Sequence, residues 1–238
     1  MEPTDPGASA GPSPPQPKRS WLDRNHDSAI LNATLKHLGL PNRQRRALTA
    51  DILAEAARLT AADTAPRPDP QTSGHRATAY LILAADRALA NAGIDPAQRR
   101  AALAHGISTP GRSLIAFATR AMLWGRRDRL TVLADYSETQ IPQRYGASFT
   151  FETAERSPDL FVQSITRCAY HDVFTRHGEP ALTQIMCAFD TMWIDATSER
   201  RDQIAFKRPT TLAEGGPNCR FEFHRTSKPD PDTGQNRD

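Results

Sequence analysis

The apolar positions of the first 140 residues recur at the spacing of amphipathic helices. Between 27 and 39, Ile30, Leu31 and Leu35 fall on one face, with Asp27 as the expected N-cap and Gly39 as the stop. The same spacing predicts helices over 43–60, 75–92, 95 onwards, 111–124 and 129–136. Three prolines within 65–74 predict an extended linker between the second and third of these helices.

Beyond residue 142 the pattern changes to the two-residue period of strands. Strands are predicted over 147–153, 160–167, 204–208 and 219–224, and helices over 168–177 and 179–196. The second of these helices carries one apolar stripe, formed by Leu182, Ile185, Met186, Phe189 and Trp193. The order β-β-α-α-β-β predicts an α+β fold, in which an N-terminal helical half packs with a four-stranded antiparallel sheet covered by helices on one face.

These patterns divide the chain into four regions. They are a disordered proline-rich tail (1–22), a helical region (23–140), an α+β region (141–226) and a second disordered tail (227–238). A hydrophobic content of 38% and a charged content of 24% fit a soluble globular protein. The net charge of +3 is too small to indicate a nucleic acid partner, which would call for a clustered basic face.

The sequence lacks the usual signals of export, membrane insertion and zinc binding. The N-terminal residues contain no apolar run like that of a secretory signal peptide, and no stretch is long and apolar enough for a membrane helix. We therefore expect a cytoplasmic protein with no membrane partner, in which the three cysteines stay reduced. These cysteines are 19 and 32 residues apart, without the short paired spacing of structural zinc sites, so neither a metal nor a cofactor is expected.

Cys168 is the sharpest candidate for chemistry, because it lies where a predicted strand passes into a predicted helix. The free N–H groups and the dipole at a helix start favour an anion, which would lower the pKa of a thiol there and generate a nucleophilic thiolate. Arg167 precedes this cysteine and His171 follows one turn later, so both could stabilise the thiolate, and His171 could also carry a proton. The alternative is that Cys168 is a small buried hydrophobic residue.

The remaining candidates each have a structural and a functional interpretation. Asp190 is three residues after Cys187 at the edge of an apolar helix face, where it is either a polar anchor or a partly desolvated general base. Cys187 alone is more typical of packing. Cys219 is expected to point into the core between sheet and helices. The Gly215-Gly216 pair before it would let the backbone approach a ligand closely, but it would equally serve a hairpin.

Two groups of residues resemble the L-2-amino-thiazoline-4-carboxylic acid hydrolase family. The first resembles that family's pattern of a helix opened by cysteine, a glycine and Cys-x-x-Asp; it comprises Cys168-Ala169-Tyr170, Val173-Phe174, Gly178, Cys187 and Asp190. The second resembles the family's closing motif; it comprises Phe206-Lys207-Arg208, Thr211-Leu212-Ala213, Gly215 and Cys219-x-Phe221. The resemblance implies a hydrolase that opens a small cyclic C–N or C–S compound, as in the specialised metabolism of bacteria. In the family's namesake reaction, water adds to the amidine-like carbon of a thiazoline amino acid, and the ring opens to a carbamoyl-cysteine.

With that resemblance, a mechanism can be assigned as a hypothesis. The Cys168 thiolate would attack an electrophilic C=N carbon, and Asp190 would position or deprotonate water. Arg167 or Arg208 would hold a substrate carboxylate, because the guanidinium fork matches that geometry. The binding pocket would also be lined by Cys187, Cys219 and Gly215.

Two other classes of function remain open from the sequence. A non-catalytic protein that binds or senses a small molecule could use the same α+β pocket, and three unreactive thiols would favour it. Alternatively, the helical half could serve as a protein interaction surface, and a homo-oligomer is one form that this could take.

Overall fold

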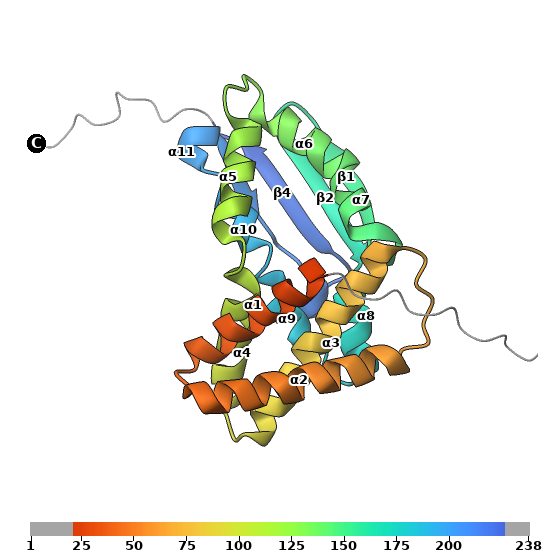
Figure 1. Cartoon of the computed structure of the whole chain (residues 1–238). Helices are drawn as coiled ribbons and strands as arrows, with labels where there is room; N and C mark the ends of the chain where they lie inside the picture. Colours follow the sequence, from red (N-terminus) through yellow and green to blue (C-terminus); the bar gives the residue numbers. More distant parts are fainter. Residues whose placement is uncertain (1–20, 227–238) are drawn as a thin grey trace, which may run out of the picture.

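The computed structural model describes residues 21–226, with helices in the first half and a sheet in the second (Figure 1). The helices of the first half are α1 (Trp21–His37), α2 (Asn42–Ala62), α3 (Pro70–Asn91), α4 (Pro96–Ser108), α5 (Arg112–Leu123), α6 (Arg129–Thr139) and α7 (Ile141–Tyr145). Asp27 lies inside α1 and is buried, so its prediction as an N-cap is wrong. The predicted linker is also shorter than expected. α3 already begins at Pro70, because Asp69 accepts a hydrogen bond from the Thr72 N–H and proline suits the first helical position.

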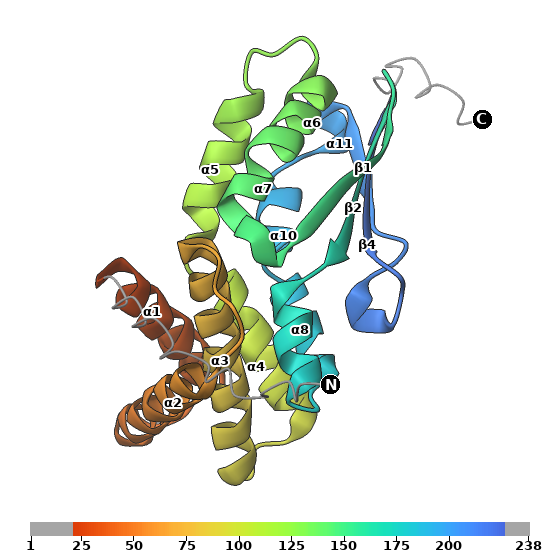
Figure 2. The same ribbon diagram turned by 90° about the vertical axis from the view of Figure 1, so that its right-hand side faces the viewer.

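The second half contains the predicted four-stranded antiparallel sheet. Its elements are β1 (Thr150–Arg156), β2 (Leu160–Arg167), α8 (Ala169–Arg176), η2 (Pro180–Leu182), α9 (Thr183–Cys187), α10 (Thr191–Ile194), α11 (Glu199–Asp202), β3 (Ile204–Lys207), η3 (Leu212–Glu214) and β4 (Cys219–Arg225). The strands lie in the order β1-β2-β4-β3, and Phe161 of β2 pairs with Phe223 of β4 on the face turned toward the helices. Figure 2 shows α5, α6, α7 and α10 on one side of the sheet, which confirms the α+β fold with one covered face.

The helix predicted over 179–196 is broken into η2, α9 and α10. Leu182, Ile185 and Met186 pack with the helices of the first half, whereas Trp193 packs against the sheet. One straight helix could not serve two separate cores, so the chain turns at 188–190 between α9 and α10. This turn is where Asp190 lies.

Two buried cores hold the fold together, and they do not follow the boundary expected at residue 140. The first, here called the helical core, joins α1 to α4 with residues of α8, η2 and α9, including Val173 and Phe174. The second, the sheet core, joins the inner face of the sheet with α6, including Leu130 and Leu133, and with partly buried residues of α5 and α10. The segments 167–169 and 188–190 therefore connect one core to the other.

The tails predicted over 1–22 and 227–238 lie outside the described residues, except that Trp21 and Leu22 open α1. Among the helices of residues 21–226, none has the combination of length and apolar character that crossing a membrane requires.

Candidate functional site

Cys168 is the N-cap of α8, as the sequence predicts. Its backbone is extended (φ −132°, ψ 119°), and its side chain makes no capping hydrogen bond. The nearby backbone N–H groups of His171 and Tyr170 favour the thiolate, but burial has the larger effect and raises the pKa of Cys168 to about 12. The expectation of a lowered pKa is therefore wrong: the helix start is present, and desolvation outweighs it.

Asp190 is the ionisable group best placed to move a proton near neutral pH. Burial raises the pKa of Asp190 to about 6, and the nearby Arg208 guanidinium partly opposes this shift. The nitrogen Nη1 of Arg208 donates to Oδ2 of Asp190 at 3.1 Å, and about a fifth of each side chain remains exposed. The guanidinium also lies over the Phe221 ring, 5.6 Å from its centroid, which keeps it close to the carboxylate.

The other two cysteines lie beside this ion pair. Cys187 ends α9, and burial together with the Asp190 charge raises its pKa to about 12. Cys219 opens β4 and is buried; burial raises its pKa, although its sulfur accepts a hydrogen bond from the Leu212 N–H at 3.3 Å. All three thiols are free. At neutral pH each is therefore protonated, and the Asp190 carboxyl is the group that titrates there.

Two tyrosines complete the group. Burial raises the pKa of Tyr145, and the charges of Asp190 and Cys168 raise it further. Burial likewise raises the pKa of Tyr170, with added contributions from Tyr145, Cys168 and Asp190. These mutual effects show that seven side chains lie within electrostatic reach of one another. We call them the cysteine–aspartate cluster: Tyr145, Cys168, Tyr170, Cys187, Asp190, Arg208 and Cys219.

A half-buried histidine contacts one side of this cluster. The Tyr170 hydroxyl donates to Nδ1 of His75 at 2.7 Å, in the tautomer whose Nε2–H donates to the Arg144 carbonyl at 3.4 Å. Burial lowers the pKa of His75, so its ring is neutral at pH 7 and can accept that hydrogen bond. The rings of Tyr145 and Phe149 pack against His75, with centroids 5.1 and 5.0 Å away.

Comparison with known proteins identifies the family. The sequence profile of the family described as L-2-amino-thiazoline-4-carboxylic acid hydrolase matches residues 72–223, well over half of the chain. The chain belongs to this family. The match begins in α3 and ends in β4, so it includes every member of the cysteine–aspartate cluster. A search of curated proteins finds no match.

The sequence predicted only some members of this candidate site. Cys168, Cys187, Asp190, Arg208 and Cys219 come together as expected candidates. Sequence reasoning assigned no role to His75, Tyr145 or Tyr170. Tyr170 lies in the family-like run after the cysteine, which was a usable signal. For His75 and Tyr145 we find no such signal, because only packing brings α3 and α7 to α8.

Three predicted site residues lie apart from the cluster or contribute differently. Arg167 is exposed and pairs with Asp172 at 2.9 Å on the surface. The backbone N–H of His171 favours the Cys168 thiolate, while the His171 ring is hydrogen-bonded to the Thr183 hydroxyl at 3.2 Å. Gly215 is exposed and adopts φ +80° at the end of η3, with open space around it, so it shapes the turn before β4. Across residues 21–226, no three His, Cys, Asp or Glu side chains gather closely enough to hold a metal ion.

Proposed function

We propose that this hydrolase opens a small ring containing C–N and C–S bonds, of the thiazoline amino acid type, with Asp190 as the proton acceptor. The observation that carries the proposal is the half-buried Asp190 carboxyl, which lies beside Arg208 and has a pKa of about 6, close to the pH at which a general base works best. The family match supports the reaction class.

The reaction balances with water as the only co-reactant. Asp190 takes a proton from a water molecule while the oxygen of that water forms a bond to the amidine-like ring carbon; the C=N electron pair moves to the ring nitrogen, which receives this proton from Asp190. Asp190 then takes the proton of the new hydroxyl group as its oxygen forms C=O and the ring C–S bond breaks; the electron pair of that bond remains on sulfur, and Asp190 passes the second proton to it. The product is an open chain with a carbamoyl group and a free thiol. Asp190 starts and ends the cycle ionised, which a pKa of about 6 allows at neutral pH.

Arg208 is the arginine that can hold a substrate carboxylate in this arrangement. It already contacts Asp190 through Nη1, and its remaining N–H groups can bind a second carboxylate. Arg167 is less suited, because it is exposed and paired with Asp172. The protonated thiols of Cys187 and Cys219 supply a polarizable lining near the ion pair.

A covalent route through Cys168 would first transfer the thiol proton to Asp190. Burial raises the pKa of this thiol to about 12, so little of it is ionised at neutral pH. In the direct route Asp190 accepts a proton from water only as the carbon–oxygen bond forms, and no free thiolate is needed, so we favour this route. Cys168 would then act through its protonated sulfur beside the bound ring.

The test is turnover of 2-amino-thiazoline-4-carboxylate, followed through the thiol that ring opening releases. We expect Asp190→Asn to reduce kcat/KM at least about 100-fold, the usual contribution of a general base. The control is Asp172→Asn, which alters a carboxylate that is also paired with an arginine, but on the surface. Cys168→Ser separates the two routes: if activity is lost there and retained in Asp190→Asn, the assignment of Asp190 is refuted and the covalent route stands.

A non-catalytic small-molecule binder is the second candidate, and one observation favours it. Burial raises the pKa of all three thiols, so none is a ready nucleophile. If the compound raises the melting temperature of the protein without any release of thiol, and Arg208→Met removes that shift, the protein binds the ring without opening it.

A further inference from the structure

The outward face of α5 is an apolar stripe. Leu114, Phe117 and Trp124 are 71%, 68% and 84% exposed, and they are the large hydrophobic residues exposed in the described part of the chain. Ala118 and Ala121 lie between them and are also exposed, so the first four of these five residues follow the i, i+3, i+4, i+7 spacing of one helix face, and Trp124 follows as the C-cap of α5. We call these five residues the α5 stripe. The opposite side of α5 packs inward through Met122 and Leu123.

The size of the stripe sets it apart from scattered surface hydrophobics. An aromatic side chain carries roughly 150–250 Å² of surface, so the exposed fractions of Phe117 and Trp124 amount to on the order of 300 Å². With Leu114 and the two alanines the stripe reaches about 500 Å², the range in which exposed patches are often functional. Two such stripes facing each other would bury about 1,000 Å², the lower limit of a specific protein interface.

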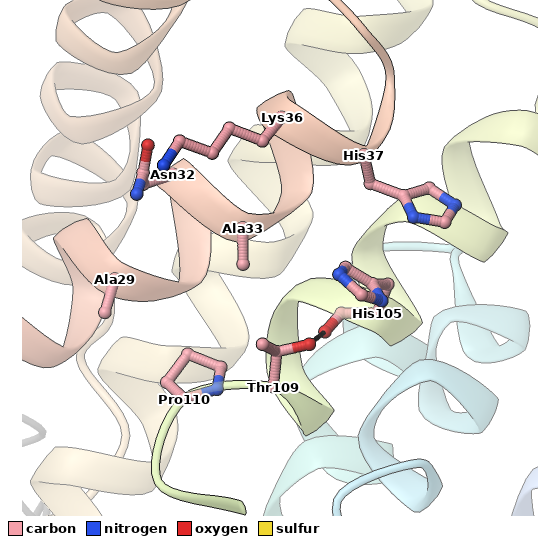
Figure 3. A pocket seen from close by; sticks show the side chains of 8 residues that line it. All are labelled: Ala29, Asn32, Ala33, Lys36, His37, His105, Thr109 and Pro110. Carbon is pink, nitrogen blue, oxygen red and sulfur yellow. Dashed lines mark hydrogen bonds between the residues drawn. The ribbon is translucent and has the colours of Figure 1, made fainter.

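A hollow lies at the N-terminal end of the same helix. It has a volume of about 520 Å³ between α1 and the end of α4, and its lining includes Ala29, Ala33 and Pro110, with His37 and His105 stacked at one end (Figure 3). Pro110 comes four residues before Leu114, about 6 Å along a helix. Figure 2 shows α1 and α5 on the same side of the molecule.

We propose that the α5 stripe binds a second copy of this chain through a two-fold axis that crosses α5 near residue 119. Such an axis aligns two antiparallel α5 helices and places Leu114 opposite Trp124, and Phe117 opposite Ala121, so that a large side chain always meets a smaller one. It also brings the protruding Trp124 of each copy to the hollow of the other. A protrusion and a hollow at opposite ends of one helix are what a self-complementary interface requires.

The composition of the chain argues against its own ends as the occupant. Residues 2–20 and 227–238 contain no Leu, Ile, Val, Phe, Trp or Tyr, so they offer no large apolar side chain to cover the stripe. The rim of the stripe is basic, with Arg120, Arg126 and Arg127 exposed. Basic rims repel each other, so added salt should strengthen the dimer, whereas it would weaken the binding of this face to an anionic membrane.

The first test measures the mass of the full chain by sedimentation velocity from low micromolar to several hundred micromolar. We expect a monomer of 26.2 kDa in equilibrium with a dimer of twice that mass, more dimer at high salt, and a dissociation constant raised about 30-fold or more in Phe117→Glu. The control is Ala54→Glu, at an exposed position on α2. A monomer across the whole range, or a dimer that Phe117→Glu leaves intact, overturns the proposal.

A cross-link tests the geometry independently of affinity. Ala118 lies next to the proposed axis, so Ala118→Cys should give a covalent dimer under mild oxidation, whereas Ala54→Cys should not. Equal cross-linking of both variants would refute the axis. Flotation with vesicles rich in phosphatidylglycerol tests the other occupant: if the wild-type chain binds these vesicles as a monomer and Phe117→Glu abolishes the binding, the stripe is a membrane contact and the dimer is excluded.

Discussion

Replacing Asp190 by Asn should remove a pH dependence from the stability of the protein. The asparagine has the shape of the protonated carboxyl and cannot ionise. In the folded chain the pKa of Asp190 is about 6, against an ordinary value of 3.8. Between these two pH values the folded state binds more protons at this site than the unfolded state does, so its contribution to stability falls as the pH rises.

The magnitude follows from the shift. A difference of about two pKa units corresponds to about 3 kcal/mol at 1.36 kcal/mol per unit. The free energy of unfolding of the wild type, minus that of Asp190→Asn, should therefore fall by about 2 kcal/mol between pH 4 and pH 7, because part of the full difference already lies below pH 4. Taking the difference between the two proteins cancels the groups that they share, including the other carboxylates.

Urea denaturation at a series of pH values, monitored by circular dichroism, measures this difference directly and needs no substrate. A difference that stays flat would mean that burial and the Arg208 charge cancel at Asp190. A difference that rises with pH would mean that the ion pair dominates and lowers the pKa. Either result refutes Asp190 as a base tuned by burial, and with it the proposed mechanism.

The other predictions concern Arg208, two glycines with positive φ and the Cys168 thiol. Arg208→Met should extend the pH-dependent difference to pH values above 6, whereas Arg208→Lys should leave its upper limit nearly unchanged, because the guanidinium charge lowers the pKa of the carboxyl beside it. Gly146→Ala should destabilise the protein by about 2 kcal/mol or more in thermal denaturation, because its φ is +68° and an added Cβ would lie 2.6 Å from Oδ1 of Asp69. Gly93→Ala, with φ +75° and open space, should cost only about 1 kcal/mol. Iodoacetamide should alkylate Cys168 with an apparent pKa far above 8.5; a value below this would restore the thiolate.

The parts of the fold that depend on local pattern were predictable. The strand over 160–167 has the predicted bounds. Asp95 caps α4 and Pro96 begins it, as expected. An Asp-Pro pair, Asp69 and Pro70, also begins α3, but because other prolines lie close by, the sequence predicted a linker there.

Features that depend on tertiary packing were not predictable. The stripe from Leu182 to Trp193 is periodic enough for one helix, and only the presence of two cores explains its break. For Cys168, the helix start could be predicted and its consequence for the pKa could not, because the effect of burial depends on residues distant in sequence. His75 joins the site from 95 residues before Tyr170, a distance that no local pattern spans.

The position of the cluster at the junction of the two cores affects how the site can diverge. Cys168 and Asp190 lie on the two segments that connect the cores. Arg208 directly follows β3 and Cys219 begins β4, whereas Tyr170 lies in α8 and packs against the helical core. A slight rotation of one packing unit against the other would alter the distances between the groups on the sheet and those on the helices. Substitutions deep in either core can therefore change which rings fit the site while each reacting side chain stays the same.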